Sequence, residues 1–135
     1  MKRSGIVTVE SRFGVTETID RLVEAVRGAG LLIFARIDHA AGARDAGLAL
    51  RPTELLIFGN PRGGTPLMLD RQICGIDLPV KALAWEDEDG KVWLSYNDPY
   101  SMAERHGLGS KSDQAVAAIA VGMEKVIAAA ADRRG

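Results

Sequence analysis

Short runs of branched and aromatic residues alternate with polar residues along much of this chain, a pattern typical of half-buried β-strands. Two of these runs flank the turn sequence EDEDG at 86–90, so they predict an antiparallel β-hairpin. The runs that read as strands are 6–10, 31–38, 54–59, 80–87 and 91–97.

Two other segments repeat apolar residues with the 3.6-residue period of an α-helix. The first covers 17–30, with Thr16 as the expected N-cap. The second covers 115–131, and its apolar face is expected to pack on the sheet through Ile119, Met123 and Ile127. Shorter helices are expected at 39–50, where an irregular excursion is the alternative, at 66–74 after a cap at Thr65, and near 98–107.

The order of these segments predicts a single domain over residues 1–135. Its class is α+β, with one mixed sheet of about five strands, helices packed on it and the C-terminal helix covering one face. The hairpin must be antiparallel, so a purely parallel sheet is excluded.

Composition changes this picture little, with 47% hydrophobic and 26% charged residues in a chain of 135. The net charge of −1 gives no electrostatic reason to expect nucleic acid or acidic membrane lipid as a partner. Cys74 is the only cysteine, which excludes an internal disulfide and suits a reducing compartment. The basic start MKR is not followed by the pattern of a signal peptide, and Glu124 interrupts the apolar run of the last helix. The cytoplasm is therefore the expected location.

The segment LLIFGNPRGGTPLM, residues 55–68, is the strongest candidate site. A buried strand ends here in a glycine-rich loop before a helix, and free backbone amides at such a point favour an anion or another polar ligand. A tight loop with Asn60 and Thr65 acting only as caps is the alternative. The phosphate-binding lysine of a P-loop is missing, so a nucleotide is not expected. The predicted ligand-binding residues are Gly59, Asn60, Arg62, Gly63, Gly64 and Thr65.

Asp38 and His39 follow the strand 31–38 and are the only catalytic candidates, with His39 as a general acid or base. The alternative is that Asp38 caps the next segment. No His, Cys or acidic residues show the spacing of metal ligands, so no metal site is predicted. Cys74 lies between apolar residues and reads as a small buried side chain.

Three segments, FARIDHAAGARDAGLAL, LLIFGNPRGGTPLM and GIDLPVKALAWEDEDGKVWLSYNDP, occur in this order along the chain. In combination they resemble the bacterial and archaeal family named domain of unknown function 302. The resemblance runs from about Thr16 to Pro99 and extends to the C-terminal helix. It implies a small α+β domain, often a stand-alone protein, and no established activity.

Three functions remain open. The first is a domain that binds a small polar or anionic ligand at 59–65, together with Asp38 and His39. The second is an enzyme that uses His39 as acid or base, for which the chain shows no cofactor fingerprint. The third is a structural module that dimerises through the hairpin aromatics Trp85, Trp93 and Tyr96. A homodimer is expected in any case.

Overall fold

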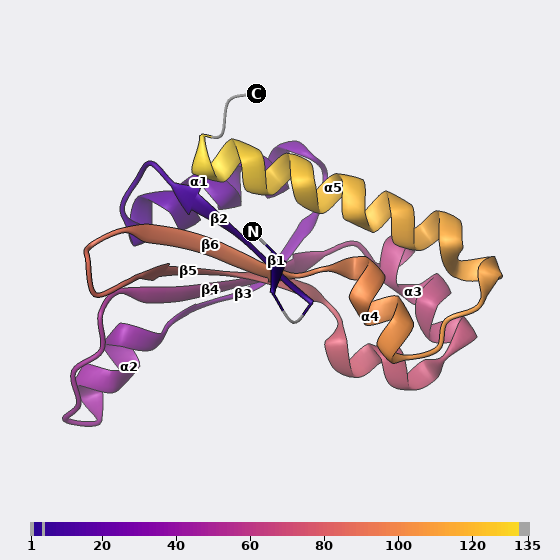
Figure 1. The fold of residues 1–135 in the computed structure, drawn as a ribbon, viewed down its shortest axis with the longest axis horizontal. Coiled ribbons are helices and arrows are strands. Elements are labelled where there is room, and N and C mark those ends of the chain that lie inside the picture. Colours follow the sequence, from indigo (N-terminus) through magenta and orange to yellow (C-terminus); the bar gives the residue numbers. More distant parts are fainter. Residues whose placement is uncertain (1, 4, 133–135) are drawn as a thin grey trace.

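The computed structural model describes residues 2, 3 and 5–132 and contains one six-stranded sheet with helices on it (Figure 1). The strands lie in the order β1-β2-β6-β5-β4-β3, and every neighbouring pair is antiparallel. Their bounds are β1 Lys2–Arg3, β2 Ile6–Ser11, β3 Leu32–Asp38, β4 Thr53–Gly59, β5 Val80–Glu86 and β6 Val92–Asn97.

Helices connect β2 to β3, β3 to β4 and β4 to β5, and further helices follow β6. The α-helices are α1 Val15–Gly28, α2 His39–Asp45, α3 Pro61–Asp70, α4 Pro99–Arg105 and α5 Asp113–Ala131. Two 3₁₀ helices, η1 Gln72–Asp77 and η2 Ser110–Ser112, follow α3 and precede α5.

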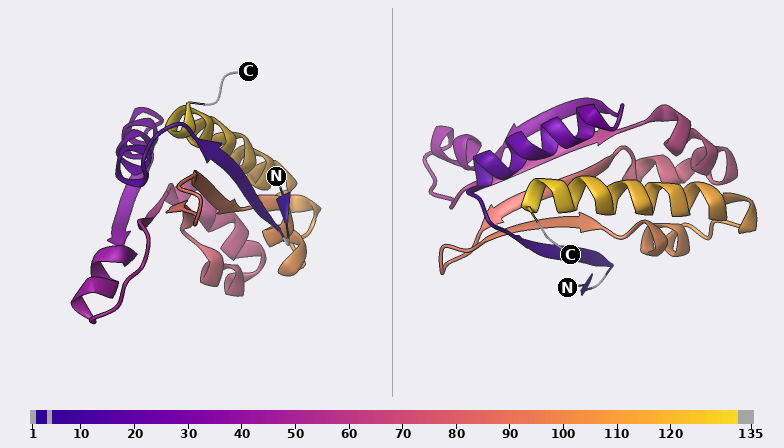
Figure 2. Two further views of the ribbon diagram at one scale, coloured as in Figure 1. Left: turned by 60° about the vertical axis from the view of Figure 1, so that its left-hand side comes forward. Right: turned by 90° about the horizontal axis from the view of Figure 1, so that it is seen from above.

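The α+β class is confirmed, and the C-terminal helix covers one face of the sheet as predicted. Helices α1 and α5 lie side by side on that face, with α5 running along the length of the sheet (Figures 1 and 2). The core between them and the sheet is formed by apolar side chains from both layers. Its fully buried members include Ile19, Leu22, Val26, Leu56, Phe58 and Leu94.

The sheet is not mixed, contrary to the prediction, because four consecutive strands from β3 to β6 each turn back beside the previous one. Strand β2 then pairs antiparallel with β6, and α1 carries the chain across the sheet from β2 to the far edge. Periodicity in the sequence identifies strands, but it does not reveal which edge a crossover helix reaches.

Helix starts were the least accurate predictions. Helix α1 is capped by Gly14 without a side-chain hydrogen bond, and the Thr16 hydroxyl instead donates to Glu54 Oε2 at 2.7 Å. Helix α3 begins at Pro61 after an Asn60 cap, so Pro66 lies inside it and Thr65 caps nothing. Both Asn-Pro and Thr-Pro are good starting pairs, and the sequence does not rank them.

The expectation that Glu124 interrupts the apolar run of helix α5 too soon for a membrane span was wrong. With the preceding turn this helix spans Ser110–Ala131, which by length and composition alone is enough to cross a membrane. In this fold its apolar face is used internally, since Met123, Val126 and Ile127 are buried in the core. Core helices commonly share this composition.

Candidate functional site

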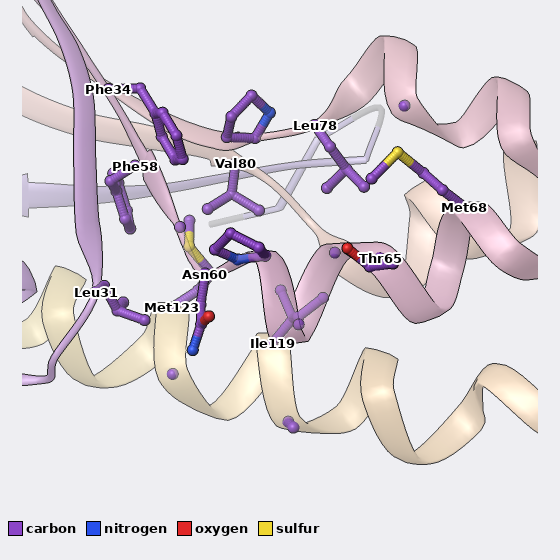
Figure 3. A pocket seen from close by; sticks show the side chains of 18 residues that line it. Leu31, Phe34, Phe58, Asn60, Thr65, Met68, Leu78, Val80, Ile119 and Met123 are labelled. Carbon is purple, nitrogen blue, oxygen red and sulfur yellow. The ribbon is translucent and has the colours of Figure 1, made fainter.

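A cavity of about 410 Å³ opens where the sheet, α3 and α5 meet, a size that suits a small-molecule ligand (Figure 3). It sits at the end of β4 and the start of β5, next to α3. Its lining comprises Leu31, Phe34, Phe58, Gly59, Asn60, Pro61, Gly63, Gly64, Thr65, Met68, Gly75, Leu78, Pro79, Val80, Ala118, Ile119, Gly122 and Met123.

Glycines of α3 allow the walls to approach closely. A Cβ at Gly63 would lie 3.7 Å from Ile119 Cγ1, and one at Gly64 would lie 3.4 Å from Leu78 Cδ1. Neither glycine has a positive φ, so their role is space rather than unusual backbone geometry. By contrast, a Cβ at Gly122 on α5 would meet no atom within 4 Å, because it faces open space.

The amides of the predicted loop are engaged inside α3. The N–H groups of Gly63 and Gly64 donate to the Asn60 carbonyl oxygen at 2.8 and 3.1 Å, and the Arg62 N–H donates to Asn60 Oδ1 at 3.0 Å. These bonds match the capping alternative for Asn60. Five of the six predicted ligand-binding residues line the cavity, but the exposed Arg62 does not.

The catalytic candidates lie elsewhere. The β3–β4 ladder pairs Asp38 with Glu54 at one end and Leu32 with Gly59 at the other, so a strand length separates Asp38 from the cavity. The Asp38 carboxylate caps α2 by accepting from the Ala41 N–H at 2.9 Å, and His39 is exposed. The structure therefore does not combine Asp38 and His39 with the glycine-rich segment in one site.

The hairpin aromatics do not form one surface. Trp85 and Trp93 are cross-strand neighbours with ring centroids 6.3 Å apart, whereas Tyr96 is buried in the core. Both indole N–H groups are bound, that of Trp85 to Ser95 Oγ and that of Trp93 to Asp87 Oδ2. The predicted homodimer thus loses Tyr96 as a contact and is otherwise untested.

Cys74 is fully buried, as the sequence analysis expected. Burial, reinforced by the nearby carboxylates of Asp77 and Asp70, raises the pKa of its thiol above the ordinary value. A thiol in this setting is a poor nucleophile at neutral pH.

A polar cleft of about 480 Å³ runs along α4 and includes Asp77, Asp98, Glu104 and Arg105. At its edge the largely buried His106 Nε2 lies 2.5 Å from Asp77 Oδ2, a pair that nothing in the local sequence indicates. Across residues 5–132 no three His, Cys, Asp or Glu side chains form a group suited to a metal ion.

The cavity walls are joined by Asp70, another residue that sequence reasoning missed. At the end of α3, its Oδ2 accepts from the Ser112 hydroxyl at 2.6 Å and from the Gly109 N–H at 2.9 Å, just before α5 begins. These two hydrogen bonds hold the pKa of Asp70 below its ordinary value of 3.8. The α3–α5 junction is therefore stabilised by an ionised carboxylate.

Replacing Asp70 should change how stability responds to acid. Because the pKa of Asp70 is lowered by folding, its contribution is present above the unfolded value of 3.8 and is lost as the pH falls through the folded value. Asp70→Asn keeps an acceptor oxygen but does not titrate. Urea midpoints measured at a series of pH values should fall more steeply for the wild type than for Asp70→Asn below about pH 4. Parallel curves would contradict this role.

A known crystal structure has the same fold as this chain. The crystal structure of an uncharacterised conserved DUF302 protein from Bacillus stearothermophilus superposes with a TM-score of 0.75, covering 97% of this chain and 98% of that one at 24% identity. At this level of identity the likeness establishes the fold alone.

More similar sequences carry the name of a membrane protein. Over 119 residues, 88% of this chain, it is 56% identical to the fluoride-specific ion channel FluC 1 of Brucella suis biovar 1 and of Brucella abortus biovar 1. It is equally similar to FluC 2 of Brucella melitensis biotype 1. The match covers only 47% of the first relative and 44% of the other two. The chain thus spans less than half the length of these relatives.

These relatives contradict the expected cytoplasmic location, because an ion channel acts in a membrane. The earlier expectation depended on the absence of a signal-peptide pattern, on the single cysteine and on an apolar run interrupted at Glu124. The family assignment is independent of that correction. The profile described as domain of unknown function DUF302 matches residues 7–130, and the chain belongs to this family.

Proposed function

We propose that this domain binds a small, largely apolar molecule in the cavity between the sheet, α3 and α5. The main support for this proposal is the cavity, because it has the volume of a ligand site and walls from three separate elements. Phe58 and Val80 belong to the sheet, whereas Ile119 and Met123 come from α5 (Figure 3).

The chemistry of the lining selects the ligand class. Asn60 and Thr65 supply the polar side chains, and the other lining side chains are apolar or absent. Met68 and Met123 are flexible and polarisable, so the walls can adapt to an aliphatic chain or a ring. A molecule with an apolar body and a single hydrogen-bonding group fits this lining better than the polar or anionic ligand expected from the sequence, because the amides of 62–64 are already bound.

The two other functions have less support. An enzyme centred on His39 would need reactive partners, and His39 lies exposed at the start of α2, a strand length from the cavity. A dimerisation module remains compatible with the exposed parts of the hairpin. We favour ligand binding. The names of the Brucella relatives support a place for this domain at a membrane.

Filling the cavity provides a direct test. Gly122→Leu should project a side chain into open space beside Ala118 and Ile119, whereas Gly122→Ala adds only a methyl group. Both replacements remove a helix-interior glycine and should raise stability by up to about 1 kcal/mol. Binding of the apolar fluorophore N-phenyl-1-naphthylamine should persist in Gly122→Ala and weaken about tenfold or more in Gly122→Leu.

The matched pair separates blocked binding from disturbed folding, since circular dichroism melting should show both variants folded. Equal dye affinity in the two variants would reject this cavity as the binding site. Absence of dye binding to the wild-type chain would reject the proposed ligand class.

A further inference from the structure

Three aliphatic side chains protrude from the segment that follows the cavity wall. Leu69 is 79% exposed at the end of α3, and Ile73 and Ile76 in η1 are 70% and 72% exposed. Side chains three residues apart lie on the same face of a 3₁₀ helix, so Ile73 and Ile76 share a face. Cys74 between them is fully buried, which fixes this face outward. We call Leu69, Ile73 and Ile76 the apolar tip.

Charges around the apolar tip are asymmetric. The exposed charged residues of 61–77 are Arg62 and Arg71. The two carboxylates of this segment are turned inward, since Asp70 binds Ser112 and Gly109, and Asp77 binds His106 and Arg105. The segment therefore offers apolar groups and the positive charges of Arg62 and Arg71 to its surroundings, and the exposed Glu104 of the adjoining α4 offsets part of that charge.

The opposite end of the molecule has the opposite character. The turn between β5 and β6 carries the carboxylates of 86–89 and lies far along the long axis from α3 (Figure 1). A negatively charged surface would attract Arg62 and Arg71, which lie in the same segment as the apolar tip, and would repel this turn, so the charge pattern also sets an orientation.

We propose that the apolar tip docks this domain on an anionic lipid bilayer, with Leu69, Ile73 and Ile76 entering the headgroup region and Arg71 contacting lipid phosphate. Exposed aliphatic residues beside basic ones are the combination that binds such interfaces. A bilayer is also the surface next to any domain attached to an ion channel, the name borne by relatives more than twice the length of the matched segment. This inference goes beyond the proposed ligand binding and does not depend on it.

Vesicle sedimentation of the full 135-residue chain tests the proposal. The wild type should bind phosphatidylcholine vesicles that contain about a third phosphatidylglycerol, bind pure phosphatidylcholine less, and release as salt rises. Ile73→Ser/Ile76→Ser should weaken binding to the anionic vesicles about tenfold. Leu48→Ser is the matched control, because Leu48 is 68% exposed but lies outside the tip, and it should bind like the wild type.

The variants keep the core intact, so unchanged melting curves are expected and would confirm that a loss of binding is local. No binding of the wild type to anionic vesicles would overturn the proposal, as would equal binding by Ile73→Ser/Ile76→Ser. A wild-type dimer that this double variant abolishes, seen by analytical ultracentrifugation without vesicles, would assign the tip to a second copy of the chain and also overturn it.

Discussion

Ile127→Asp is expected to unfold this domain at room temperature. Ile127 is 2% exposed on the face of α5 that packs into the core, so the new carboxylate would be buried without a partner. Loss of the side chain's burial and packing costs about 2–5 kcal/mol, and burial of an unpaired polar group adds further cost. A domain of this size has about 5–15 kcal/mol of stability in total. Circular dichroism should show loss of the cooperative melting transition.

Val121→Asp on the same helix is the control, because Val121 is 57% exposed. Its melting temperature should stay within a few degrees of wild type, since exposed substitutions usually change stability by about 0.5 kcal/mol or less. The pair also tests what α5 does in this chain, whose composition would suit a membrane span. Similar, small effects at both positions would contradict its place as a core helix.

The sequence predicted most elements correctly because their signals are local. Strands β5 and β6 were recognised from alternation and from the intervening turn, and they end within one residue of the prediction. The apolar period of α5 correctly placed Met123 and Ile127 in the core. The all-antiparallel sheet was missed because strand order depends on the path of α1, which leaves no mark in the local pattern.

The candidate site shows the limit of local reasoning more clearly. The segment 59–65 was singled out for its glycines, and it does line the cavity. The expectation of free backbone amides was wrong because Pro61, rather than Pro66, begins α3, and that shift of five residues places the amides of Gly63 and Gly64 inside the helix.

The opposite cavity wall could not be inferred from the segment itself. Ala118 and Gly122 lie one helical turn apart on α5, and small residues at that spacing could have suggested a hollow. Only the fold brings them beside α3, through the Asp70 contacts to Gly109 and Ser112. Asp38 and His39 were associated with the loop because both follow strands, yet β3 and β4 run in opposite directions.

The ion pair between the buried Glu54 and the partly exposed Arg36 should be the second most sensitive feature of the fold. Glu54 in β4 is 5% exposed, and its Oε1 accepts from Arg36 Nε at 3.0 Å. Arg36 also donates to Asp20 Oδ1 at 2.7 Å and to the Thr16 carbonyl. Burial alone would lower the pKa of Arg36, but its hydrogen bonds to Asp20 and Glu54 raise it overall, so the guanidinium stays charged.

Arg36→Met should destabilise the domain by about 2–3 kcal/mol, because it leaves the Glu54 carboxylate buried without its cation. The value lies below that of a fully buried pair, since the Arg36 side chain is 34% exposed and water screens part of the interaction. Adding Glu54→Leu should recover most of the loss, because the orphaned charge is then removed as well. Urea unfolding of the two single variants and the double variant measures this coupling.

Arg12→Met provides the matched comparison for that cycle. Arg12 forms a 2.8 Å ion pair with Asp132, but its side chain is 62% exposed, so its removal should cost less than about 1 kcal/mol. Arg12→Met deletes one ion pair, with a partly exposed carboxylate, whereas Arg36→Met deletes two, one with the exposed Asp20 and one with the buried Glu54. If Arg36→Met costs no more than Arg12→Met, or if Glu54→Leu does not rescue it, the buried carboxylate is not what makes Arg36 necessary.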